Sequence, residues 1–110
     1  MVDKVVAVGL VLPELTRRVA ENHLDELSKL IESAGATVVT TVLAKRKSPD
    51  PASFVGSGKA EEIGEIAKRH RATLIVLDDD LSPAQVRNLE GIIGVKVIDR
   101  SGLILDIFAR

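Results

Sequence analysis

The residues best suited to chemistry lie in the segment 45–59, between an apolar run that ends near Ala44 and a helix-like run that begins near Lys59. The segment opens with three consecutive cations: Lys45, Arg46 and Lys47. Clustered cations of this kind contact nucleic-acid phosphates, although three charges can also form only a solvated edge. The segment is longer than the roughly 4 to 6 residues of most connections, which is typical of loops that are functional or disordered. We expect Lys45, Arg46, Lys47 and Lys59 to contact RNA phosphates.

The exit of the segment reads Gly56-Ser57-Gly58-Lys59 and leads into the helix-like run. Accessible backbone amides at a helix start, with a cation beside them, favour an anion or phosphate. A flexible turn that caps the helix explains the same four residues, and both interpretations stay open. A complete Walker A loop is excluded, because Ser53 stands where its first glycine is needed and Ala60 stands where its hydroxyl is needed.

The other candidate residues are acidic. Asp78, Asp79 and Asp80 follow an apolar run, where they could hold magnesium, but a solvated loop that favours the next helix start is the simpler interpretation. Asp99 and Arg100 precede another turn, for which helix capping by Asp99 or Ser101 is the plain interpretation. No Ser, His and acid set suggests a catalytic triad. We therefore expect no catalytic residue in this chain.

Composition narrows the possible functions. The 110 residues have room for one domain, residues 1–110, and carry a net charge of −1, which argues against a general DNA-coating protein. The chain has no cysteine and only two histidines, His23 and His70, at separate places, so we expect no metal site. Aromatic residues make up 2% of the chain, which argues against reading single strands by stacking bases on rings. No apolar run is long enough for a membrane span, and we expect a cytoplasmic protein that binds neither membrane nor DNA.

Strand-like and helix-like runs alternate along the chain. Near-continuous apolar runs at 4–12, 37–44, 74–77 and 95–98 predict strands buried on both faces. Helical spacing predicts helices around 24–34, 59–70 and 83–93, the last with Ser82 as N-cap, Pro83 at the first position and Gln85 in a capping box. The fold class is therefore α/β: an open, mostly parallel four-stranded sheet with helices on both faces, in the order βαβαβαβα. We expect the strand order 2-1-3-4.

The chain ends on an apolar stretch, Leu103 to Phe108, followed by Ala109 and Arg110. Its spacing predicts a terminal helix that covers the last strand. The stretch also fits a helix that leads into another domain of a longer protein, in which case the chain is an N-terminal fragment.

Three stretches together resemble a known family. They are AKRKSPDPASFVGSGKAEEI at 44–63, DDDLSPAQVRNLE at 78–90 and KVIDRSGLILDIFAR at 96–110. In their order and spacing they are similar to the N-terminal domain of the HflX family of ribosome-associated GTPases, over essentially the whole chain.

The resemblance implies a division of labour. In the family, a helical region and a GTPase domain follow this domain, and GTP and magnesium bind to that GTPase domain; this chain contains none of its motifs. The resemblance implies that the partners are the large ribosomal subunit with its rRNA and the protein's own GTPase domain. It also implies a role in GTP-regulated splitting or rescue of stalled ribosomes under stress, with no GTP hydrolysis and no cofactor in this fragment. Two alternatives stay open: an adenine-nucleotide module that binds ATP and magnesium through residues 56–59 and 78–80, and an intramolecular platform for the GTPase domain at residues 103–108.

Overall fold

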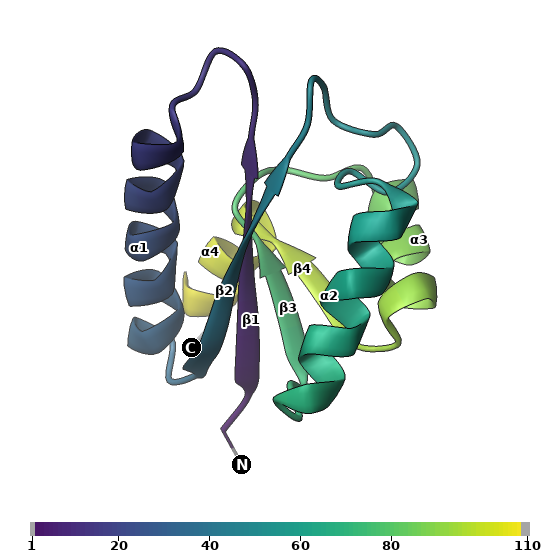
Figure 1. Cartoon of the computed structure of the whole chain (residues 1–110). Coiled ribbons are helices and arrows are strands. Elements are labelled where there is room, and N and C mark those ends of the chain that lie inside the picture. The colour runs from purple at the N-terminus through teal and green to yellow at the C-terminus, as the bar shows by residue number, and fades with distance from the viewer. Residues whose placement is uncertain (1, 109–110) are drawn as a thin grey trace.

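The computed structural model describes residues 2–108 and contains a four-stranded parallel sheet. The strands are β1 (Lys4–Val11), β2 (Thr37–Lys45), β3 (Leu74–Leu77) and β4 (Lys96–Asp99). The strand order is β2-β1-β3-β4, as the sequence predicted (Figure 1). Val5 to Val8 of β1 are buried because strands pair with β1 on both sides and helices cover both faces of the sheet.

Two helices cover each face of the sheet (Figure 1). Helices α1 (Arg17–Ser33) and α4 (Arg100–Phe108) lie on one face, where Leu27, Ile31 and Leu103 pack against Val5 and Val76. Helices α2 (Ser57–Arg69) and α3 (Pro83–Ile93) lie on the other. The α/β class with helices on both faces is confirmed.

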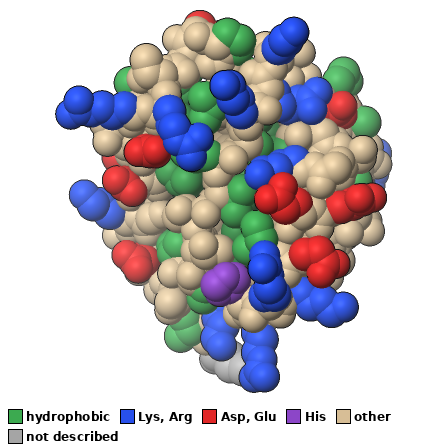
Figure 2. Space-filling view, viewed as in Figure 1, with side chains coloured by type: hydrophobic (Ala, Val, Ile, Leu, Met, Phe, Trp, Pro, Cys, Tyr) green, Lys and Arg blue, Asp and Glu red, His purple; other side chains and the backbone are tan. Residues whose placement is uncertain are grey.

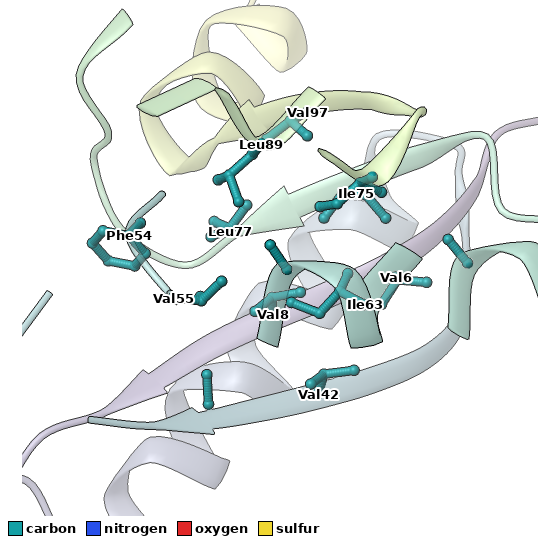
Figure 3. Packing of buried hydrophobic residues seen from close by; sticks show 14 of the residues in the cluster. Val6, Val8, Val42, Phe54, Val55, Ile63, Ile75, Leu77, Leu89 and Val97 are labelled. Carbon is teal, nitrogen blue, oxygen red and sulfur yellow. The ribbon is translucent and has the colours of Figure 1, made fainter. Parts of the chain in front are cut away.

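The larger core cluster lies between the sheet and helices α2 and α3. Ile63 of α2 and Leu89 of α3 pack against strand residues such as Val8 and Ile75 (Figure 3). The long loop between β2 and α2 also contributes Phe54 and Val55 to this cluster. That loop is therefore part of the core as well as part of the surface.

Helices α3 and α4 begin at predicted caps, whereas α1 begins at Arg17, well before the predicted start near residue 24. The Thr16 side chain caps α1 by accepting from the Val19 N–H, a signal that the apolar spacing did not reveal.

Ser82 and Gln85 form the expected capping box at the start of α3, and Gly94 ends that helix with a left-handed backbone. At α4, the backbone N–H of Gly102 donates to the Asp99 carboxylate, which confirms Asp99 as a cap. Helix α2 begins at Ser57, earlier than expected, because Gly56 takes the N-cap position with φ of 89°. The side chains of Ile107 and Phe108, in the predicted terminal stripe, lie outside the described part.

The carboxyl ends of the parallel strands meet at one edge of the sheet, where the connections 12–16, 46–56 and 78–82 also lie (Figure 1). Open α/β sheets bind ligands at this edge, outside the strand ends. The fold thus gathers the cationic segment and the three aspartates at the edge where function is expected.

Candidate nucleic-acid interface

The loop 46–56 is held in shape by Asp50. The backbone N–H groups of Ala52 and Ser53 both donate to the Asp50 carboxylate at 2.8 Å, and the Ser53 hydroxyl donates to it at 3.2 Å. These hydrogen bonds, first of all the one from the Ser53 backbone, hold the pKa of Asp50 below its usual value. Asp50 and Phe54 also exchange two backbone hydrogen bonds, each 2.9 Å long. A single aspartate therefore closes the turn.

Helix α3 ties the loop to the body of the protein. The side-chain amide of Gln85 donates to the Asp50 carbonyl at 2.9 Å, and that of Asn88 donates to the Ala52 carbonyl at 2.9 Å. Below these bonds Phe54 and Val55 are buried in the core, with Phe54 at a positive φ of 63°. The loop is thus held to the fold by two side-chain amides of α3 and by its own buried residues, Phe54 and Val55.

The four predicted RNA-contacting cations are placed differently. Lys45 and Lys47 are exposed. Arg46 is half-buried: its Nε donates to the Ser48 carbonyl at 2.8 Å, and its Nη2 lies 3.9 Å from the Asp50 carboxylate. Lys59 forms an ion pair with Glu62 at 3.1 Å. Lys45 and Lys47 therefore present their charge to solvent most openly, whereas Arg46 also supports the loop.

The predicted anion-binding turn forms the start of α2. Gly56 is its N-cap, and no side chain caps the helix there. Ser57 and Gly58 are exposed, whereas Gly56 is buried under Arg46. A Cβ on Gly56 would lie only 2.4 Å from Nη1 of Arg46. The structure thus brings Arg46 and the turn together, and it leaves the first amides of α2 without a capping side chain.

A groove of about 670 Å³ lies between the end of β2 and the connection that follows β1. One wall carries Lys45, Arg46 and Lys47, and the other is formed by four apolar residues and a cation: Val11, Leu12, Pro13, Leu15 and Arg17. On the face in Figure 2, Lys and Arg side chains lie around hydrophobic side chains in the upper part, over these connections. The sequence analysis missed this wall, since residues 12–17 show neither a charge run nor a glycine motif.

Two of the three aspartates, Asp78 and Asp79, line a second cleft, of about 370 Å³, beside the ends of β1 and β3. Arg100 donates to the Asp78 carboxylate at 3.2 Å, and the Ser101 hydroxyl donates to Asp80. Burial raises the pKa of Asp78 and of Asp79, and Arg100 opposes the rise. Two of the three acids thus have protein partners, as in a structural loop. Within residues 2–108, no group of three His, Cys, Asp or Glu side chains is placed to hold a metal ion.

A helix that crosses a membrane needs about 20 predominantly apolar residues. None of the helices between residues 2 and 108 combines sufficient length with sufficient apolar character.

Comparisons with known proteins place this chain in a family. The family model described as GTP-binding GTPase N-terminal matches residues 21–109. Curated relatives include the GTPase HflX of Lacrimispora saccharolytica, 50% identical over 82% of this chain, and that of Escherichia coli, 49% identical over 79%. The aligned regions amount to 21% and 20% of those two proteins, so the chain spans about a fifth of their length.

Solved structures agree on the fold. A GTP-binding protein from Sulfolobus solfataricus in complex with GDP superposes with a TM-score of 0.67 at 21% identity, over 96% of this chain and 30% of that one. The G235S variant of SsGBP superposes with a TM-score of 0.68 at 22% identity, over 94% and 32% of the two chains. The solved structures support the fold, and the family model and the sequence relatives show that the chain belongs to the GTP-binding GTPase N-terminal family, as an HflX N-terminal domain.

Proposed function

We propose that this chain is the ribosome-binding domain of an HflX-type GTPase and that it contacts rRNA of the large subunit. In this proposal, GTP hydrolysis and its magnesium belong to a GTPase domain elsewhere in the parent protein. The state of that domain decides when the ribosome-binding domain docks, in support of ribosome splitting or rescue under stress.

The observation that carries the proposal is the anchored cationic loop. Lys45 and Lys47 are exposed at the base of a loop whose turn is fixed by Asp50 and by two amides of α3. A rigid loop loses little conformational entropy on binding, so more of the interaction energy with phosphates remains as affinity. The chain as a whole is nearly neutral, which supports a local contact with RNA phosphates over general coating.

Charge reversal tests the proposal. Lys45→Glu combined with Lys47→Glu should weaken cosedimentation with large ribosomal subunits by at least about tenfold, because two phosphate contacts become repulsive. Arg46 is left unchanged in this variant because it also supports the loop. Lys29→Glu combined with Lys68→Glu, at exposed positions on α1 and α2, makes the same change in net charge and should bind normally. Equal binding by the double variant and the parent would refute the proposal.

Calorimetry with ATP and magnesium tests the competing adenine-nucleotide module. The uncapped start of α2 is the feature that favours it. Saturable heat that Lys59→Ala abolishes would support that module in place of the ribosome-binding proposal. No heat at millimolar ATP would remove it.

A further inference from the structure

The groove between residues 11–17 and 45–47 combines two kinds of surface. Lys45, Arg46 and Lys47 form its cationic wall, and the opposite wall carries the side chains of Leu12, Pro13 and Leu15. Its volume of about 670 Å³ lies within the range of about 300 to 1,000 Å³ typical of small-ligand sites. The cationic wall and the apolar wall together determine which kind of ligand would fit the groove.

The charge of the residues that line the groove indicates that its occupant is an anion. Four of the eight described residues that line the groove are Lys or Arg and none of them is acidic, although the whole chain has a charge of −1. The Arg17 guanidinium is paired with Glu21 at 3.2 Å, whereas Lys45 and Lys47 are exposed. A free phosphate would use only this cationic wall and would leave the apolar wall in water. An occupant that carries a phosphate next to an apolar, flat group uses both walls.

The backbone beside the groove is already hydrogen-bonded. The Arg46 N–H donates to the Val11 carbonyl at 2.9 Å, and the Leu15 N–H donates to the Leu12 carbonyl at 3.0 Å. An extended peptide that binds by strand addition needs a row of free backbone groups. These two bonds oppose strand addition between the two walls, so an occupant of the groove is recognised by side chains.

We propose that this groove binds one unstacked RNA nucleotide, with its base against Leu12, Pro13 and Leu15 and its phosphate at Lys45 and Lys47. The proposal rests on the proposed function and deepens it, because it adds a base contact to the phosphate contacts. Proteins that recognise RNA often take up bases splayed out of loops and bulges. Aromatic stacking is not required here, since aliphatic and prolyl side chains supply the apolar surface.

Replacing the apolar wall tests the base contact separately from the phosphate contacts. Leu15→Gln should weaken binding to large ribosomal subunits by about tenfold, the loss expected when a leucine side chain no longer buries apolar surface against the base. It should leave the salt dependence of binding unchanged, because no charge is altered. Val19→Gln, an apolar position 38% exposed on α1 and absent from the groove lining, is the matched control and should bind like the parent.

The combination of variants separates the two proposals. If Lys45→Glu with Lys47→Glu abolishes binding while Leu15→Gln binds normally, the nucleotide groove is overturned and the proposed function stands. If neither variant changes binding, both are overturned. Thermal and urea unfolding of Leu15→Gln identifies a loss that comes from misfolding.

Photocrosslinking tests whether an RNA nucleotide occupies the groove, and it does not depend on how Leu15→Gln affects folding. Benzoylphenylalanine in place of the exposed Pro13, irradiated on large subunits, should label rRNA at a single unpaired nucleotide. The same group at position 92, on α3, should not. Labelling of ribosomal protein alone would favour a peptide occupant and would overturn the proposal, as would the absence of any label in the bound complex.

Discussion

Gly56 and Arg46 share one small space at the start of α2. The backbone of Gly56 has φ of 89°, and Nη1 of Arg46 lies where a Cβ would be. Few residues other than glycine adopt this conformation, and here the side chain of an alanine would also displace the guanidinium. The backbone conformation is therefore the main constraint at this position, since the end of the flexible Arg46 side chain can move aside.

Gly56→Ala should accordingly destabilise the protein by about 1 to 3 kcal/mol, the usual cost of a strained backbone conformation. Gly58→Ala is the matched control two residues further on, because a Cβ there meets nothing within 4 Å. That change should be neutral or stabilise by up to about 1 kcal/mol, since alanine favours the helix. Urea unfolding measures both. Equal effects of the two substitutions would contradict the structural account of Gly56.

Asp50 gives the loop a defined dependence on pH. Its pKa is lower in the folded protein than in the unfolded chain, where an aspartate titrates near about pH 4. Its contribution to stability is therefore present above about pH 4 and is lost as the pH falls through the folded-state pKa. Asp50→Asn keeps an acceptor oxygen but carries no charge.

We expect the difference in unfolding free energy between the parent and Asp50→Asn to be larger at pH 7 than at pH 3. Urea unfolding of both proteins at each pH measures this difference. Comparing the two proteins at the same pH cancels the effect of the other carboxylates, which titrate in both. A difference that does not change with pH would show that the ionised carboxylate does not hold the turn.

Among the elements, α3 donates two side-chain hydrogen bonds to the loop. Gln85 accepts from the Ser82 N–H in the capping box and donates to the Asp50 carbonyl, so one side chain both starts the helix and holds the loop. Asn88, one turn further along, donates to the Ala52 carbonyl. The β2–α2 loop is thus stabilised by a helix that comes after it in the chain.

Replacing the side-chain amide of Gln85 or Asn88 by a carboxylate removes the hydrogen-bond donor to the loop. Gln85→Glu keeps the cap acceptor but removes the donor to the loop, and should cost about 1 kcal/mol, as should Asn88→Asp. Gln85→Glu should also speed backbone amide hydrogen exchange at residues 50–54. Asn22→Asp, at an exposed position on α1, makes the same chemical change and should stay within about 0.5 kcal/mol of the parent. Unchanged exchange in Gln85→Glu would mean that the loop keeps its shape without α3.

The elements were largely predictable from the sequence, whereas the site was predictable only in part. Apolar runs marked the four strands and the Ser82 and Gln85 pattern marked the start of α3, because these signals are local. The burial of Phe54, its positive φ and its pairing with Asp50 depend on contacts with distant segments. For the same reason the charge run at 45–47 was visible, but not the support that Arg46 gives to the loop or the apolar wall at 12–15.

At the scale of the whole molecule, the sheet presents its cationic features at one edge. The order β2-β1-β3-β4 sets the end of β2 beside the end of β1, so their following connections flank one groove. The aspartates 78–80 follow β3, on the other side of β1. In our account, this arrangement lets a nearly neutral domain bind RNA at one edge of its sheet.

The most direct test is the salt dependence of binding between this chain and large ribosomal subunits. Each phosphate contact adds a slope of about −0.7 to −0.9 to a plot of log affinity against log salt concentration. With Lys45, Arg46, Lys47 and Lys59 in contact, the account predicts saturable binding with a slope near about −3, reduced by about 1 in Lys47→Ala. The absence of saturable binding at low salt, or a slope near zero, would contradict it.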